Sequence, residues 1–259
     1  MEGQGNWFLI AARLQGVVIK FQYADMLPVD HIPFACCDLA LLGATFERLG
    51  FFVSPRAEFR SPDAPGEVWP TRGVFLEGGW FDLQAVPSGG TDRLAGPRSC
   101  LFRARDLESA AKALRPLRLD PPFRLTRHWD EPPKTPALSM AYANLRARIA
   151  PLMLAIIAYD DQGSDVDPHW TRHPNSALEI LGLAFPAPAP GPAAEAAARV
   201  LDLSGFRYGA PGIGVRVRVG DLDRTAECLT AGLVEFSRSG PEIHVPAFDI
   251  LECTFSFST

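Results

Sequence analysis

Lysine is scarce in this sequence, and no charge-free apolar run reaches the length of a membrane span. Only three of the 259 residues are lysine, against 22 arginines, and the formal net charge is −5. Without a basic stripe, the composition argues against a general nucleic-acid-binding protein. The lack of an apolar run of about 18 residues argues against a transmembrane helix, so no membrane partner is expected.

Cysteine is too irregular for a disulfide framework or a structural zinc site. The five cysteines are Cys36, Cys37, Cys100, Cys228 and Cys253, an odd number with no CxxC pair. Three of them lie inside apolar runs, where cysteine usually behaves as a small buried apolar residue. This usage favours a reducing, cytoplasmic environment.

Several catalytic signatures are also missing. The sequence has no Walker loop, no GxGxxG after a strand, no HExxH and no GxSxG elbow. The common nucleotide-binding, zinc-protease and serine-hydrolase architectures are therefore not indicated.

The first 26 residues stand apart from the rest. Their apolar segments are interrupted by Arg13 and Lys20, and Glu2 replaces a basic leader, so no signal peptide is predicted. Two interpretations stay open: an extension ahead of a true start at Met26, or a docking helix. We expect the first folded element near Pro28.

An internal repeat organises the remainder. Three segments share an apolar strand, an Asp-Leu pair and an amphipathic helix, and the pairs begin at Asp38, Asp106 and Asp221. Each aspartate is placed to cap its helix, because its carboxylate can accept free backbone N–H groups. The intervals of 68 and 115 residues predict a degenerate copy between the second and third pairs, which residues 177–203 provide.

Strands are expected after each helix, so the predicted unit is βαβββ or a trimmed form of it. A tight turn is expected at Gly78-Gly79, and residues 139–149 are ambiguous. The predicted strands are 51–54, 72–76, 80–86, 123–128, 153–158, 177–185, 214–219, 234–237 and 251–257. The predicted fold class is α+β, divided into an extension (1–26), paired modules (27–160), a linker (161–174) and further modules of the same type (175–259). Residues 131–136 form a second linker.

The segment around Asp30-His31-Ile32, Asp38-Leu39 and Leu49-Gly50-Phe51 resembles the opening of the vicinal-oxygen-chelate superfamily, in its glyoxalase-like branch. The stretches GGWFDLQAV and RHPNSALEILGLAF resemble later parts of that pattern, with Ser176 in place of a glycine. The resemblance implies curved mixed sheets around a cavity. It also implies a divalent iron, manganese, nickel or zinc ion acting as a Lewis acid, in a lyase, isomerase or ring-cleaving dioxygenase.

The resemblance places His31 at a metal-ligand position and Asp82, which is also the catalytic candidate, where the family usually has glutamate. The position in the second module that matches His31 is Ser99, a poor ligand. His173 and Glu252 are the candidates that could complete the ligand set from the C-terminal half. A local turn at His173 and a half-exposed strand at Glu252 are the alternative interpretations.

Strand alternation puts Trp80, Asp82 and Gln84 on one face. That face either lines the cavity, so that Trp80 and Gln84 contact substrate, or points to solvent. Asn175 is a further substrate-binding candidate, with a local turn as its alternative.

In two of the modules, the first predicted strand places a pair of arginines on one face: Arg103 with Arg105, and Arg216 with Arg218. Lining a cavity, they would suit an anionic substrate, and Arg103 is the binding candidate. Otherwise they are solvated strand edges.

Three functions stay open: a small-molecule enzyme, a binding protein with a degenerate metal site, and a structural module with a filled cavity. The partner is expected to be a small molecule. Four modules could pair within one chain, so the protein is expected to be a monomer or a homodimer.

Overall fold

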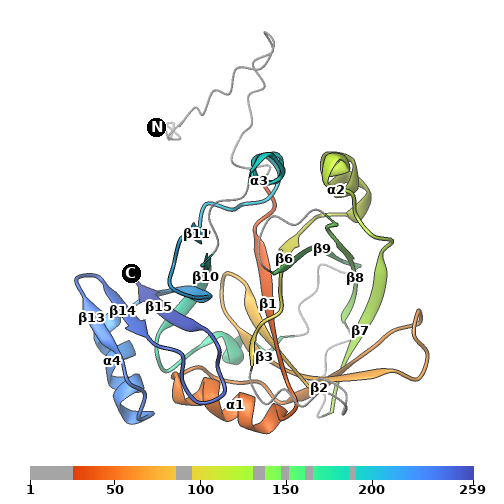
Figure 1. The fold of residues 1–259 in the computed structure, drawn as a ribbon. Coiled ribbons are helices and arrows are strands. Elements are labelled where there is room, and N and C mark those ends of the chain that lie inside the picture. Colours follow the sequence, from red (N-terminus) through yellow and green to blue (C-terminus); the bar gives the residue numbers. More distant parts are fainter. Residues whose placement is uncertain (1–25, 86–94, 131–137, 147–151, 161–165, 187–190) are drawn as a thin grey trace, which may run out of the picture.

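The computed structural model describes residues 26–85, 95–130, 138–146, 152–160, 166–186 and 191–259, and shows a closed barrel beside an open sheet (Figure 1). Within these ranges, eight strands close the barrel in the order β4-β3-β2-β7-β8-β9-β6-β1, because β1 also pairs with β4. They are β1 (Val29–Cys36), β2 (Arg56–Arg60), β3 (Val68–Phe75), β4 (Trp80–Ala85), β6 (Ser99–Arg103), β7 (Phe123–Trp129), β8 (Leu138–Asn144) and β9 (Met153–Tyr159). The short β5 (Gly96–Pro97) lies against β1.

The barrel is made of two βαβββ modules. The first contains α1 (Leu39–Arg48) after β1, and the second contains α2 (Leu107–Ala113) and a 3-10 turn, η2 (Arg115–Leu117), after β6. In each module the first strand pairs in parallel with the last, β1 with β4 and β6 with β9. Antiparallel pairing of β1 with β6 and of β2 with β7 joins the modules. The expected paired βαβββ architecture is confirmed.

All three predicted aspartate caps form. The Asp38 side chain accepts from the Leu41 backbone N–H, Asp106 from that of Ser109, and Asp221 from two successive N–H groups. Each cap satisfies N–H groups that have no partner inside the helix, and each therefore fixes where the chain leaves the strand.

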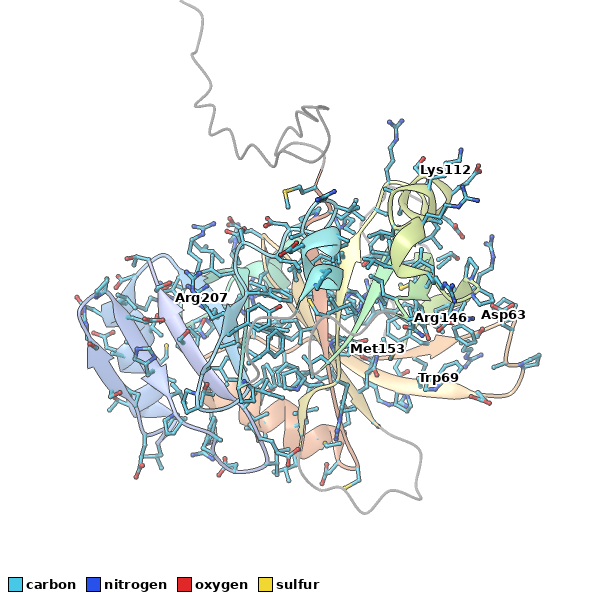
Figure 2. All side chains as sticks on the ribbon, turned by 45° about the horizontal axis from the view of Figure 1, so that its top comes forward. Asp63, Trp69, Lys112, Arg146, Met153 and Arg207 are labelled. Carbon is cyan, nitrogen blue, oxygen red and sulfur yellow. The ribbon has the colours of Figure 1, made fainter. Side chains whose placement is uncertain are left out.

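The second sheet has the order β11-β10-β12-β15-β14-β13 and does not close. Its elements are β10 (Ala177–Phe185), α3 (Pro192–Ala197), β11 (Arg207–Tyr208), β12 (Gly214–Val219), α4 (Leu222–Ala231), β13 (Ser237–Ser239), β14 (Glu242–Val245) and β15 (Thr254–Ser258). The run from β12 to β15 repeats the full module, with β12 parallel to β15. The run from β10 to β11 is a trimmed module, so β11 and β13 remain as edges. Figure 2 shows Arg207 of β11 and Asp63 of the β2–β3 hairpin on opposite sides of the molecule.

One apolar core joins the barrel to the second sheet. Phe34 and Phe46 of the first module pack against Phe255 of β15, with ring centroids 6.2 and 5.8 Å apart. Each of these rings is almost fully buried, and burial of such a ring contributes about 2 kcal/mol. Gly50 also lies at the contact between the barrel and the second half of the chain. Its φ of 82° suits glycine, and a Cβ there would lie 2.8 Å from the Asn175 Cβ.

The best predicted strands coincide with the structure, whereas the strand predicted at 51–54 is absent and those predicted at 234–237 and 251–257 begin only at Ser237 and Thr254. Residues 177–185 and 214–219 match β10 and β12. Residues 51–54 are not a strand, because Ser54 exchanges hydrogen bonds with the Gly73 backbone through its own N–H and hydroxyl instead of through a ladder. Residues 234–236 are also not a strand; β13 begins only at Ser237, after Leu233 adopts a φ of 55° behind α4.

Other predictions lie partly or wholly outside the described residues. The N-terminal segment 1–25 and the whole 131–136 linker are among them. Part of the 161–174 segment forms a 3-10 turn, η3 (Pro168–Thr171), and residues 139–144 of the ambiguous stretch belong to β8. Within the described ranges, no helix has the length and apolar character to cross a membrane.

Removal of the Asp221 cap should destabilise the second half of the protein. Asp221→Ala is expected to lower the free energy of unfolding by about 1 kcal/mol, because two backbone N–H groups at the start of α4 lose their acceptor. Urea denaturation measures this change. Glu227→Ala, at an exposed position of the same helix, is the matched control and should change stability by less than about 0.5 kcal/mol. Equal losses in both variants would contradict the cap's role.

Candidate active site

A cleft of about 760 Å³ lies at one mouth of the barrel, facing the second sheet. The barrel contributes the beginning of β1 and β4, the end of β3, β6 and β9, and the interior of β7; the second sheet contributes part of β10. Its volume is in the range typical of small-molecule sites. A bound molecule would therefore lie between the two halves of the chain.

A β-bulge at the start of β1 directs two consecutive side chains to the inside. Leu27 and Val29 pack against the apolar core that joins the barrel to the second sheet. Ile32 and every second residue after it in β1 pack against the same core. The residues that face this core are therefore odd-numbered before the bulge and even-numbered after it. The pairing of β1 with β6 shifts at the same place, between Val29 and His31. As a result Asp30 and His31 are both buried at the barrel mouth.

Asp30 is the centre of a hydrogen-bond network. Its Oδ1 accepts from His31 Nδ1 at 2.7 Å, from the Tyr159 hydroxyl at 2.6 Å and from Trp80 Nε1 at 3.3 Å. Its Oδ2 accepts from Arg103 Nε at 2.6 Å. The Asp30 side chain is fully buried, and these donors replace the water that burial removes.

These contacts fix the protonation of the network. Burial alone would raise the pKa of Asp30, but the hydrogen bond and charge of His31, the charge of Arg103 and the Tyr159 hydroxyl hold it well below its usual value. Burial and the charge of Asp30 raise the pKa of Tyr159, which keeps its proton. Because a carboxylate only accepts hydrogen bonds, His31 must carry its proton on Nδ1. Among the described residues, Nε2 of His31 has no hydrogen-bond partner.

Three arginines line the cleft on the barrel side: Arg103, Arg105 and Arg127. The guanidinium carbon of Arg127 lies 5.1 to 5.2 Å from the ring centroids of Phe75, Trp80 and Trp129, and this side chain is buried. Arg103 lies over the Tyr159 ring at 5.1 Å, and 58% of its side chain is exposed. Since Nε of Arg103 is held by Asp30, the guanidinium is fixed at the rim of the cleft.

Asp82 lies deeper in the barrel. The Thr71 hydroxyl donates to its Oδ1, and Gln84 Nε2 donates to its Oδ2 at 2.5 Å. Burial raises the pKa of Asp82, while the charge of His31, the two hydrogen bonds and Arg127 act in the opposite direction. Asp82 is thus a buried acid within electrostatic range of His31.

The structure brings five of the predicted site residues together in or beneath the cleft. Trp80, Asp82 and Gln84 share the inner face of β4, as the alternation predicts. Phe81 and Leu83, which lie between them, face the apolar core that joins the barrel to the second sheet. His31 packs on Trp80 with ring centroids 4.5 Å apart, and Arg103 lies at the rim. These residues come from three strands that meet around β1.

His173 and Asn175 lie outside the cleft, where their hydrogen bonds connect the two halves of the chain. His173 Nδ1 accepts from the Phe52 backbone N–H at 3.0 Å, and Nε2 contacts the Phe75 carbonyl oxygen at 2.7 Å. Asn175 donates to the Leu49 carbonyl oxygen and accepts from the Ala177 N–H. The main chain therefore occupies both His173 nitrogens, which leaves no lone pair for a metal ion.

Glu252 is also apart from the cleft. It is exposed and lies against Gly96, at the opposite end of β1 from Asp30. Of the second arginine pair, Arg218 binds Glu179 at 2.8 Å, and Arg216 donates to the Gly205 carbonyl oxygen at 3.0 Å.

The side chains present do not fit a resident divalent ion. His31 offers only Nε2, both Asp82 oxygens are engaged, and Ser99 occupies the matching position of the second module. Iron, manganese and zinc centres in enzymes usually take three protein ligands. In the described part of the chain, no three His, Cys, Asp or Glu side chains lie together in such a group.

Three important residues were not predicted as site residues: Asp30, Arg127 and Tyr159. Asp30 was noted only as part of the Asp30-His31-Ile32 motif. Arg127 lies within a predicted strand, on the same face as Phe123, Leu125 and Trp129, and an arginine on an otherwise apolar strand face is the available signal. Tyr159 ends an otherwise aliphatic strand, and its polar tip was the corresponding signal there.

No family model and no curated protein matches this sequence. Among solved structures, a xylose isomerase-like TIM barrel/4-hydroxyphenylpyruvate dioxygenase fusion protein is similar, with a TM-score of 0.51 and 12% identity. The alignment covers 95% of this chain and 51% of that one, so this chain spans about half its length. This likeness shows the vicinal-oxygen-chelate type of fold.

Two further structures are more distant. A triple mutant of 4-hydroxymandelate synthase from Streptomyces coelicolor has a TM-score of 0.42 and 10% identity, over 90% of this chain and 94% of that one. Methylmalonyl-CoA epimerase in complex with methylmalonyl-CoA and ammonium has a TM-score of 0.34 and 19% identity, over 54% and 99%.

The neutral, buried His173 should make stability depend on pH in mild acid. Burial lowers its pKa from 6.5 to about 4, so the unfolded chain takes up the proton first. The stability contribution is complete above pH 6.5 and is lost as the pH falls through about 4. In urea denaturation from pH 7 to 4, His173→Gln should lose less of its free energy of unfolding than the wild type. The exposed His128→Gln should keep the wild-type slope; identical slopes in all three proteins would contradict this role.

Asp30→Asn should destabilise the barrel mouth strongly. The change leaves the His31 Nδ1–H and Arg103 without their charged acceptor, and loss of buried hydrogen bonds to a charged group costs about 2 kcal/mol. Because the folded pKa of Asp30 is lowered, its contribution is complete above the unfolded value of about 3.9 and is lost below it. The difference in unfolding free energy between wild type and variant should thus shrink from pH 5 to pH 2. The control is the exposed ion pair between Asp223 and Arg238. Asp223→Asn should lower the free energy of unfolding by less than about 1 kcal/mol.

Proposed function

We propose that this chain, a protein with the vicinal-oxygen-chelate fold, is a small-molecule enzyme that transfers a proton at the mouth of its closed barrel. The observation that carries the proposal is the buried Asp30–His31 pair beside the cleft. A carboxylate that holds Nδ1–H leaves the Nε2 lone pair as a base.

In the proposed step, His31 Nε2 removes a proton from a C–H group of the substrate. The C–H bond breaks, its electron pair stays on the substrate, and the proton is held as imidazolium. Asp30 stabilises the imidazolium through the 2.7 Å contact, and the buried Arg127 stabilises the negative charge on the substrate. Return of the proton to the same or a neighbouring carbon completes an epimerisation or isomerisation.

The donor set supports acid–base chemistry over metal-ion catalysis. Asp30, His31 and Tyr159 are already oriented by mutual hydrogen bonds, whereas a third metal ligand is missing among the described side chains. The isomerase type suggested by the sequence needs only such proton transfers, and the lyase type combines them with departure of a leaving group from the substrate, so both are favoured over a ring-cleaving dioxygenase.

Binding without catalysis is the second candidate. The observation that favours it is the low exposure of His31 and Asp82, 4% and 2%. In that case the substrate contacts Trp80, Arg103 and Tyr159 at the cleft surface but does not reach Nε2.

Deuterium exchange distinguishes the two candidates. Small organic acids are first screened for raised melting temperature, because a ligand specific to the folded state stabilises it. Bound compounds are then incubated with the protein in D2O, and loss of substrate C–H signals is followed by proton NMR. The wild type should catalyse exchange, and His31→Gln should retain binding but lose about 100-fold or more of the rate.

The matched control is His128→Gln, an exposed histidine on β7, which should exchange at the wild-type rate. Exchange that persists in His31→Gln would assign the base to another group. Bound compounds that never exchange would favour the binding protein.

A further inference from the structure

We infer that the ligand of the cleft is bipolar, with an anionic group toward the barrel mouth and a cationic group toward the second sheet. The inference rests on the cleft being the ligand site, as proposed above. It follows from the distribution of charge on the two sides of the cleft.

The barrel side supplies positive charge. Arg103, Arg105 and Arg127 line the cleft from β6, its following turn and β7. Asp30 is the acidic group on this side, and Arg103 already compensates its charge. The exposed end of Arg103 provides a planar fork of donors, the group best suited to a carboxylate or phosphate.

The second half of the chain supplies negative charge. Glu179 of β10 and Asp202, which follows α3, line the cleft from the second half. Glu77 in the β3–β4 turn extends this acidic side, because Gly78 next to it forms a bridge with Glu179. Arg218 binds one oxygen of Glu179, and the Ser204 N–H donates to Asp202.

This acidic side is an extended wall and not a chelating cluster. The described Glu77, Glu179 and Asp202 do not come together as a metal-binding group. A cation that matches the wall is therefore an ammonium or a similar organic group, whose donors reach one carboxylate at a time.

Apolar side chains line the cleft along with the charged residues: Phe75, Trp80, Leu138 and Ile180. A ligand whose charged ends are joined by a planar or aliphatic centre matches this combination of groups. A compound with one charge would leave one side of the cleft facing apolar atoms without compensation.

Three probes of equal skeleton test the inference: 4-(aminomethyl)benzoate, 4-methylbenzoate and 4-methylbenzylamine. Isothermal titration calorimetry measures each dissociation constant with the full-length wild type. The bipolar probe should bind at least about tenfold more tightly than either singly charged probe, as expected for one added charge-assisted hydrogen bond.

Variants assign each end. Glu179→Gln should weaken 4-(aminomethyl)benzoate but not 4-methylbenzoate, whereas Arg103→Gln should weaken both. Glu235→Gln, an exposed carboxylate outside the cleft lining, is the control and should change neither.

Equal affinity of 4-methylbenzoate and the bipolar probe, or no binding of any probe, would overturn the inference. Neither result affects the proposed proton transfer, which the exchange rate of the His31 variant tests with ligands found by screening.

Discussion

A buried carboxylate must be fully partnered, and this requirement at Asp30 organises the whole barrel mouth. Its four partners come from four strands: His31 from β1, Trp80 from β4, Arg103 from β6 and Tyr159 from β9. Two of these strands belong to each module, so one side chain links both repeats. The same contacts set the histidine tautomer and the direction of the arginine, and in this way folding and site geometry share one network.

The sequence predicted the fold wherever a local signal decided the structure. The caps at Asp38, Asp106 and Asp221 depend on contacts within three residues, and all three form. The predicted strand at residues 51–54 failed because its apolar residues are buried without a ladder partner, which only the tertiary structure determines. The trimmed third module was foreseen as a degenerate copy, but its missing strands and the open sheet could not be derived from spacing.

In the candidate site, strand alternation is sufficient to predict that Trp80, Asp82 and Gln84 share one face, but it does not predict that Asp30 faces the inside of the barrel. Neighbouring residues of a regular strand face opposite sides, so His31 inside would place Asp30 outside. The bulge removes that constraint, and it has no signature in the sequence. His173 illustrates the reverse case: a motif residue became part of the contact between the two halves of the chain, because its partners at Phe52 and Phe75 lie about a hundred positions earlier in the chain.

The open second sheet has a consequence for how such a protein can change over time. A module that does not have to close a barrel tolerates substitutions and length changes more easily than one that does. The cleft is lined by Asp30 and Tyr159 from the closed barrel and by Glu179 and Asp202 from the trimmed module. In the proposed enzyme, selectivity could therefore diverge through residues such as Glu179 and Asp202 while the barrel residues stay constant, which would let one scaffold serve many related metabolites.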